Sequence, residues 1–174
     1  MNYAAIKNCD IANGLGIRIS LFVSGCTHHC KGCFNAQTWS FDFGQPFTKE
    51  VEDNIIEQLK KPHIKGLTLL GGEPMEKQNQ FGLISLLRRV INELPNKDVW
   101  CYSGYLLEEL CDKNHRSHTQ ITDEILSLID VLVDGEFIEE KKNLRLKFRG
   151  SSNQRLINMK KTLEEKKLVL LDLE

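Results

Sequence analysis

The chain has 174 residues, of which 41% are hydrophobic and 27% charged, and its formal net charge is −1. This length and composition predict a single globular domain over residues 1–174. The balanced charge argues against nucleic-acid binding, and no apolar stretch reaches the ~18 residues that a membrane span needs. The start of the chain has no secretory pattern, so six cysteines indicate a reducing cytoplasm, where clustered cysteines serve metal or redox chemistry.

Apolar runs and helical stripes alternate along the chain. Short runs rich in β-branched residues predict strands, whereas 3.6-residue periodicity with capping residues predicts helices. The predicted strands are Ile17–Ser24, Leu67–Leu70, Asp98–Tyr102, Asp130–Asp134 and Leu168–Leu173. The predicted helices are Thr48–Lys61, Gln80–Leu94, Tyr105–Cys111, Asp123–Ile129 and Gln154–Glu165.

This alternation predicts parallel strands joined by right-handed crossovers. Unusual motifs follow the first four strands: a cysteine-rich run, Gly-Gly-Glu-Pro at 71–74, Ser-Gly-Tyr at 103–105 and Asp-Gly-Glu at 134–136. Because the carboxyl ends of parallel strands share one edge, we expect these motifs to form one site. About five strands are too few for a closed eight-stranded barrel. The predicted fold is therefore α/β, a partial, open (β/α) barrel with mostly parallel strands.

Cys26, Cys30 and Cys33 form a Cys-x3-Cys-x2-Cys run, which is the most informative pattern in the chain. An odd number of close thiols cannot all form disulfides, but three can bind one metal cluster. Three ligands on a four-iron cluster leave one iron without a protein ligand, whereas structural iron–sulfur and zinc sites normally use four. The spacing therefore favours a reactive [4Fe-4S] centre.

A structural zinc site is the alternative to an iron–sulfur cluster at these cysteines. His28 or His29 would have to supply the fourth zinc ligand, and we interpret both as exposed loop residues instead. The scattered Cys9, Cys101 and Cys111 are interpreted as small buried hydrophobic residues.

These motifs resemble the radical S-adenosylmethionine superfamily and, within it, the activating proteins of anaerobic (class III) ribonucleoside-triphosphate reductases. Two departures weaken a match to other glycyl-radical activases: Asn13 and Leu15 stand where those proteins have Asp and Pro. Gly32 precedes the third cysteine, where many superfamily members carry an aromatic residue. The matching motifs are Asn-Gly-Leu-Gly-Ile-Arg at 13–18, Gly-Cys-Phe-Asn at 32–35, Gly-Gly-Glu-Pro at 71–74, Tyr-Ser-Gly-Tyr at 102–105, Val-Asp-Gly-Glu-Phe at 133–137 and Arg-Gly-Ser-Ser-Asn-Gln-Arg at 149–155.

The resemblance implies a barrel of the radical S-adenosylmethionine type and two cofactors. A [4Fe-4S] cluster would be bound by the three cysteines, and S-adenosylmethionine would chelate its open iron. The implied cofactor contacts come from two segments: Gly71, Gly72 and Glu73 toward the amino group, and Gly32, Cys33 and Phe34 toward the adenine. Phe34 would otherwise be a core residue.

Two strand-end residues complete the expected site. Ser103 and Asp134 either contact the ribose or methionine part of the cofactor or serve as turn and cap residues. The segment 141–155 carries six basic residues and no acidic one; we expect it to be a solvated loop, or to contact the cofactor carboxylate or a partner enzyme. Its one aromatic residue, Phe148, is too little for a nucleic-acid platform.

The implied function is activation of the anaerobic reductase. Reductive cleavage of S-adenosylmethionine would give a 5′-deoxyadenosyl radical, which abstracts hydrogen from a glycine of the reductase and leaves a glycyl radical. The implied electron donor is a flavodoxin- or ferredoxin-like protein. The alternatives are a small-metabolite enzyme similar to the 7-carboxy-7-deazaguanine synthases, an activase of another glycyl-radical enzyme such as pyruvate formate-lyase, and a regulatory module with a structural cluster.

Overall fold

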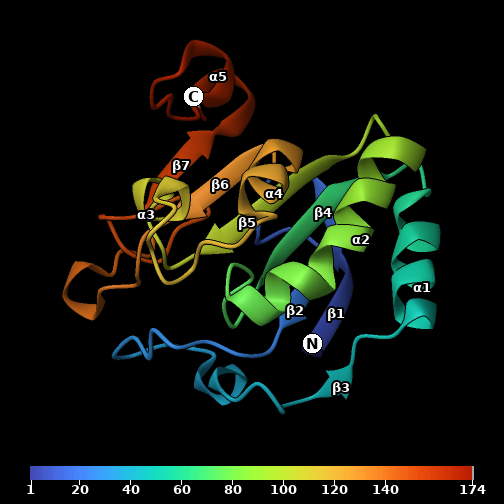
Figure 1. Ribbon diagram of the computed structural model, residues 1–174, viewed down its shortest axis with the longest axis horizontal. Coiled ribbons are helices and arrows are strands. Elements are labelled where there is room, and N and C mark those ends of the chain that lie inside the picture. Colours follow the sequence, from blue (N-terminus) through green and yellow to red (C-terminus); the bar gives the residue numbers. More distant parts are fainter. Residues whose placement is uncertain (174) are drawn as a thin grey trace.

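The computed structural model describes residues 1–173, which form one mixed sheet with helices (Figure 1). The strands are β1 (Asn2–Asp10), β2 (Ile17–Val23), β3 (Gln45–Pro46), β4 (Ile64–Gly71), β5 (Asp98–Ser103), β6 (Val131–Asp134) and β7 (Arg155–Asn158). The α-helices are α1 (Lys49–Leu59), α2 (Lys77–Glu93), α3 (Leu107–Cys111), α4 (Thr122–Leu128) and α5 (Met159–Glu165), and Ala36–Trp39 and Glu139–Lys141 form single 3-10 turns. None of the helices in the described part of the chain combines the length and apolarity needed to cross a membrane.

The seven strands lie in the order β3-β1-β2-β4-β5-β6-β7. The four central strands β2, β4, β5 and β6 are parallel, and β1, β3 and β7 are antiparallel to their neighbours. The predicted α/β class and the parallel pairing are therefore confirmed for the centre of the sheet. The curvature of a partial barrel stays a prediction.

The central strands are buried on both faces, which explains their nearly continuous apolar sequences. Residues such as Leu21, Leu69 and Leu132 pack with the apolar faces of α1, α2 and α4 in the main core. A smaller apolar cluster around Trp100 and Val133 is separate from that core. Alternate residues of β6 therefore pack in different clusters, Leu132 in the main core and Val131 and Val133 in the smaller one.

The amino-terminal strand β1 was not predicted. Its sequence contains few apolar residues, and only Tyr3 and Ile6 of this strand pack against the main core. Because β1 pairs on one side with β2 and on the other with only the two residues of β3, it lies near an edge of the sheet, where a continuous apolar pattern is not required.

The carboxyl-terminal region differs from the prediction. The helix expected over Gln154–Glu165 begins only at Met159, because Leu156 and Ile157 face opposite clusters as residues of β7. The strand expected over Leu168–Leu173 is also wrong: this segment forms an isolated bridge between Leu170 and Ile157. The free edge of β6 pairs with β7 instead, which extends the sheet by one antiparallel strand.

The motif at 13–18 surrounds a buried charge. Arg18 is fully buried, pairs with the Asp98 carboxylate at 2.6 Å and donates to the Thr68 hydroxyl at 2.7 Å. Its guanidinium lies 5.4 Å from the centre of the Trp100 ring. A Cβ atom on Gly14 would lie 2.8 Å from the Arg18 side chain, so glycine leaves the room that this arginine needs. The motif thus joins the three neighbouring strands β2, β4 and β5.

Candidate functional site

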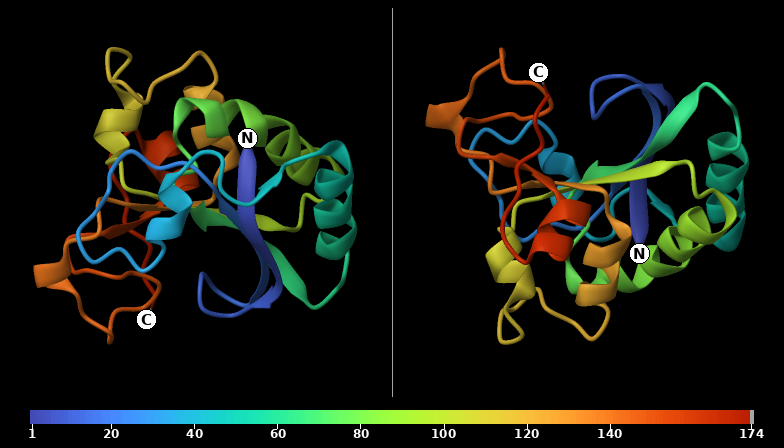
Figure 2. Two further views of the ribbon diagram at one scale, coloured as in Figure 1. Left: turned by 90° about the horizontal axis from the view of Figure 1, so that it is seen from below. Right: turned by 90° about the horizontal axis from the view of Figure 1, so that it is seen from above.

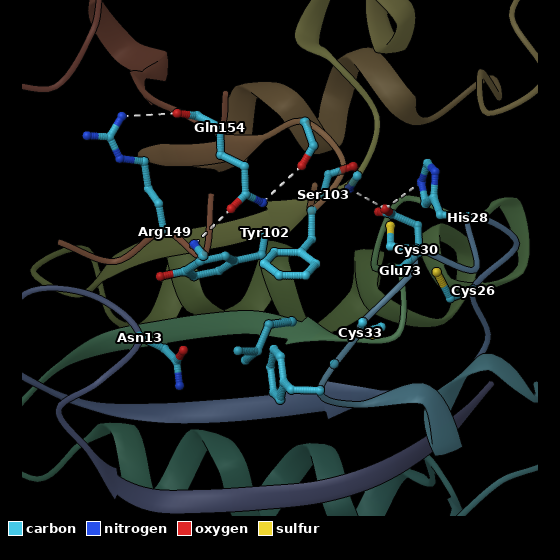
Figure 3. A pocket seen from close by; sticks show the side chains of 18 of the residues that line it. Asn13, Cys26, His28, Cys30, Cys33, Glu73, Tyr102, Ser103, Arg149 and Gln154 are labelled. Carbon is cyan, nitrogen blue, oxygen red and sulfur yellow. Dashed lines mark hydrogen bonds and ion pairs between the residues drawn. The ribbon is translucent and has the colours of Figure 1, made fainter. Parts of the chain in front are cut away.

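A cavity of about 540 Å³ lies at the carboxyl ends of the parallel strands (Figure 3). Four loops contribute to its lining: the cysteine loop (24–35) after β2, the Gly-Gly-Glu loop (72–76) after β4, the Ser-Gly-Tyr loop (104–106) after β5 and the Asp-Gly-Glu loop (135–138) after β6. The predicted convergence of these motifs on one edge is confirmed. Residues 142–150 line a further part of the cavity.

Cys26, Cys30 and Cys33 all line this cavity as free thiols. Cys26 is buried, and the other two are half-buried. The Cys33 amide donates to the Cys30 carbonyl at 3.1 Å in a turn that also requires a positive φ of 72° at Gly32. The cysteine loop therefore directs three thiols from one short segment into one space.

The donor set fits an iron–sulfur cluster. Among residues 1–173, no three histidine, cysteine or acidic side chains already stand close enough to hold a single metal ion. A cluster separates its thiolates more widely than a single ion does, because each thiolate binds a different iron. Three thiols that share a cavity without converging on one point are compatible with that wider arrangement.

Burial disfavours the thiolate form of Cys26 and Cys30. Burial raises the pKa of Cys26 to about 12, and burial followed by the charge of Glu136 raises the pKa of Cys30. Since thiolates are the metal-binding form, loading this site with metal would release protons.

Gly71 and Gly72 allow the Gly-Gly-Glu loop to approach the cysteine loop closely. Gly71 has a φ of 111°, and the Gly72 amide donates to the Val23 carbonyl at 2.8 Å. A Cβ atom on Gly72 would lie 2.6 Å from the Gly25 carbonyl oxygen. Larger residues would push these two loops apart.

Glu73 is the buried carboxylate of the site, with 1% of the residue exposed. One of its oxygens accepts from the Met75 amide at 2.8 Å. The other accepts from the Gly104 amide at 2.6 Å and lies 3.1 Å from His28 Nε2. The Glu73 carboxylate therefore connects its own loop to the Ser-Gly-Tyr loop and to the cysteine loop.

His28 is a cavity-lining residue that the sequence analysis did not place in the site. Its side chain is 4% exposed, so the expectation of an exposed loop residue is wrong for His28, whereas His29 is exposed as expected. Both His28 ring nitrogens face carboxylates, those of Glu73 and Glu136. Burial alone would lower the His28 pKa, but the hydrogen bond and charge of Glu73, followed by those of Glu136, raise it above its ordinary value. With both nitrogens engaged, His28 is not free to serve as the fourth zinc ligand.

Gly32 and Phe34 flank Cys33 at the mouth of the cavity. Gly32 has a φ of 72°, which favours glycine, and a Cβ atom there would lie 2.7 Å from the Glu139 carboxylate. Phe34 is 89% exposed and lines the cavity, so it is not a core residue. An exposed ring at this position is available to a bound ligand.

Ser103 and Asp134 both have structural partners. The Ser103 hydroxyl accepts from the Tyr105 amide at 3.1 Å, and Ser103 also lines the cavity. The fully buried Asp134 carboxylate accepts from the Leu107 amide at 2.8 Å and binds Arg155 through both oxygens. Asp134 is not among the cavity-lining residues, so we assign it to joining β6, β7 and α3.

The basic segment divides into two parts. Lys142 and Arg149 line the cavity, whereas Arg155 is bound to Glu108 as well as Asp134. The hypothesis of a cofactor or partner contact therefore applies to residues 142–149 rather than to Arg155. Figure 2 shows this segment beside the cysteine loop in both views. Lys31 of the cysteine loop pairs at 3.4 Å with Glu139, which lies just before the segment.

Two of the scattered cysteines are exposed. Cys101 is buried as predicted, but the burial predicted for Cys9 and Cys111 is wrong. Cys9 lies on β1, and Cys111 is the last residue of α3.

Comparisons with known proteins match an iron–sulfur domain model and a group of reductase-activating proteins. A family profile described as a "4Fe-4S single cluster domain" matches residues 12–157. The chain is 47% identical to the anaerobic ribonucleoside-triphosphate reductase-activating protein of Vibrio cholerae serotype O1 and 46% identical to that of Escherichia coli K12, over 88% of this chain and 96% of each relative. The protein of the same name from Enterobacteria phage T4 is 41% identical over 90% of this chain and 93% of the relative.

Proposed function

We propose a radical-generating activity for this chain, which belongs to the family of anaerobic ribonucleoside-triphosphate reductase-activating proteins. In this proposal Cys26, Cys30 and Cys33 bind a [4Fe-4S] cluster and leave its fourth iron for S-adenosylmethionine. The observation that carries the proposal is that three free thiols and the Gly-Gly-Glu loop line the same cavity. When bound, the two cofactors would supply one-electron cleavage of the sulfonium and a 5′-deoxyadenosyl radical that takes a hydrogen atom from a glycine Cα.

The side chains of the cavity would orient the cofactor. The Glu73 carboxylate already accepts from three donors, so one of its roughly four acceptor sites remains for the cofactor's ammonium group. The exposed Phe34 ring offers an apolar surface for the adenine, together with the Gly32 and Cys33 backbone. Ser103 lines the cavity and is retained as a candidate for the ribose or methionine contact.

The proposed substrate is the reductase itself. The relatives are named as activators of that enzyme, and a partial, open barrel of the radical S-adenosylmethionine type would leave one side of the site for a protein loop to cover. A flavodoxin- or ferredoxin-like protein would supply the electron. Six free thiols fit a reducing compartment such as the cytoplasm.

Electron paramagnetic resonance on an anaerobic mixture tests this proposal. The mixture contains cluster-reconstituted protein, reductant, S-adenosylmethionine and the anaerobic reductase of the same organism. We expect a glycyl doublet that disappears when any one component is omitted. A cluster that is reduced normally but produces no doublet would contradict the proposed partner and would favour a small-metabolite substrate.

A further inference from the structure

His28 occupies an unusual position within the cysteine loop. It lies between Cys26 and Cys30, and its side chain is 4% exposed although the flanking Thr27 and His29 are both exposed. A polar side chain that turns inward from an exposed loop loses contact with water, so its ring nitrogens need partners inside the protein.

The partners of the His28 ring come from all three of the other cavity loops. Nε2 lies 3.1 Å from the Glu73 carboxylate of the Gly-Gly-Glu loop (Figure 3). Nδ1 lies 2.7 Å from the Glu136 carboxylate of the Asp-Gly-Glu loop. The ring also packs on Tyr105 of the Ser-Gly-Tyr loop, with ring centres 4.3 Å apart. One imidazole therefore touches the loops that follow β4, β5 and β6.

The inner partner of the ring is itself fixed. The Glu73 carboxylate is held by the Met75 and Gly104 amides, so it presents the oxygen that faces His28 in one orientation. Gly104 also leaves the space that the ring occupies, since a Cβ atom there would lie 2.7 Å from the imidazole. Backbone amides, a buried carboxylate and a glycine thus define where the ring lies.

The adjacent histidine provides an internal contrast. His29 has a φ of 52° and packs on Trp39 within the following 3-10 turn, with ring centres 4.6 Å apart. Among residues 1–173 no hydrogen bond from the His29 ring to another cavity loop is found. Two neighbouring residues of the same type therefore differ in whether they join the cysteine loop to the rest of the site.

We infer that His28 is a positioning residue that fixes the cysteine loop, and with it Cys26 and Cys30, against the Gly-Gly-Glu loop. This inference rests on the proposed function, in which the distance between the two loops matters because each loop holds one cofactor. The cluster would be bound by one loop and the ammonium group of S-adenosylmethionine by the other. His28 acts through its hydrogen bonds to both carboxylates and needs no contact with either cofactor.

Hydrogen exchange on the cluster-free protein tests the inference without activity. His28→Phe keeps a ring against Tyr105 but removes both hydrogen bonds, and His29→Asn is the control, because asparagine tolerates the positive φ of that position. We expect the amides of residues 26–34 to exchange about tenfold faster in His28→Phe, which corresponds to about 1.4 kcal/mol, and to be unchanged in His29→Asn. Equal exchange in the two variants would overturn the inference.

A second variant covers the case in which His28→Phe does not fold. The Glu136 side chain is 55% exposed, so Glu136→Ala removes only the outer hydrogen bond of His28. We expect exchange in residues 26–34 to rise about threefold in this variant. No change relative to the wild-type protein would contradict the inference.

The cluster-loaded protein separates positioning from general stability. We expect His28→Phe to raise the KM for S-adenosylmethionine about tenfold while the glycyl radical yield at saturating cofactor stays within about twofold. Adding S-adenosylmethionine should change the resonance spectrum of the reduced cluster in the wild-type protein. We expect this spectral change to be different in His28→Phe. A loss of yield with unchanged KM and spectrum would indicate a structural role only and would overturn the inference, whereas a wild-type protein that forms no radical would refute the proposed function itself.

Discussion

Two buried carboxylates, Glu52 and Glu73, hold different regions of the molecule together by different means. Glu52 on α1 is bound by the charged side chains of Lys49 and Arg89 at 2.8 and 2.9 Å, and by the Ser85 hydroxyl. Glu73 is bound by two backbone amides and one imidazole. The first network joins helices α1 and α2, and the second joins loops around the cavity.

The difference follows from what each region requires. Two packed helices need only to stay together. Long, flexible charged side chains can do this, because they form an ion pair in many conformations. A ligand site needs its loops in one conformation, and a backbone amide that donates to a fixed oxygen restrains the loop itself. Glu52 is therefore expected to affect stability, and Glu73 is expected to affect function as well.

The largest effect is expected from the cysteines. Replacing Cys26, Cys30 and Cys33 together with alanine should abolish iron binding and radical formation, yet leave a folded protein, because none of the three forms a disulfide. Iron analysis and resonance spectra measure the first effect, and circular dichroism measures the second. A variant that no longer folds would show that the cluster site is structural. The cavity loops and the α1–α2 network would then no longer differ in function.

The Glu73→Gln variant tests the cavity side of the comparison directly. The amide keeps one acceptor, but its NH₂ group faces either the Met75 or the Gly104 amide and leaves that donor unpaired. We expect the initial rate of glycyl radical formation to fall about 100-fold and the free energy of unfolding to fall by about 2 kcal/mol. Radical formation at the wild-type rate would show that the carboxylate does not organise the site.

The cysteine triad and the strand-end motifs were predictable because their signals are local in the sequence. Three cysteines within eight residues and glycines after apolar runs can be recognised without knowing the fold. The four parallel strands and most helices were predicted for the same reason, since their apolar periodicity reflects burial by near neighbours.

The polar contacts of the site could not be predicted in the same way. His28 binds carboxylates that are 45 and 108 residues away, at Glu73 and Glu136, and no spacing rule reaches that far. Asp134 was expected at the cavity, but Arg155 and the Leu107 amide, 21 and 27 residues away, engage its carboxylate. The strand β7 was missed because a short apolar pair fits a helix and a strand equally well until its pairing partner is known.

Asp134→Asn tests whether a buried carboxylate outside the cavity affects stability without affecting function, as we expect for Glu52. Arg155 would lose a charged partner on β6, while its contact with Glu108 would remain. We expect the free energy of unfolding to fall by about 2 kcal/mol and the KM for S-adenosylmethionine to change less than twofold. Denaturant titration and steady-state kinetics measure the two effects. A raised KM with unchanged stability would return Asp134 to the cofactor site.

Glu52→Gln is the matched variant for Glu73→Gln. The amide retains hydrogen bonds but loses the charge that faces Lys49 and Arg89. We expect the free energy of unfolding to fall by about 1 kcal/mol and the rate of radical formation per folded molecule to stay the same. Urea titration at low salt measures the first quantity, because an ionic denaturant would screen the charge. If this variant slowed radical formation as much as Glu73→Gln, the distinction between the two carboxylates would be lost.

The pH dependence of stability gives the smallest effect. Burial alone would raise the pKa of Glu52, but hydrogen bonds from Arg89, Lys49 and Ser85 hold it below its ordinary value of 4.5. A carboxylate whose pKa is lowered by folding stabilises the protein above the unfolded-state pKa, and this contribution is lost as the pH falls through the folded-state value. The difference in unfolding free energy between the wild-type protein and Glu52→Gln should therefore be constant from about pH 7 to 5 and shrink below about pH 4.5. A difference that stays constant down to about pH 3 would mean that the charge of Glu52 contributes nothing, and that only its hydrogen-bonding geometry joins the two helices.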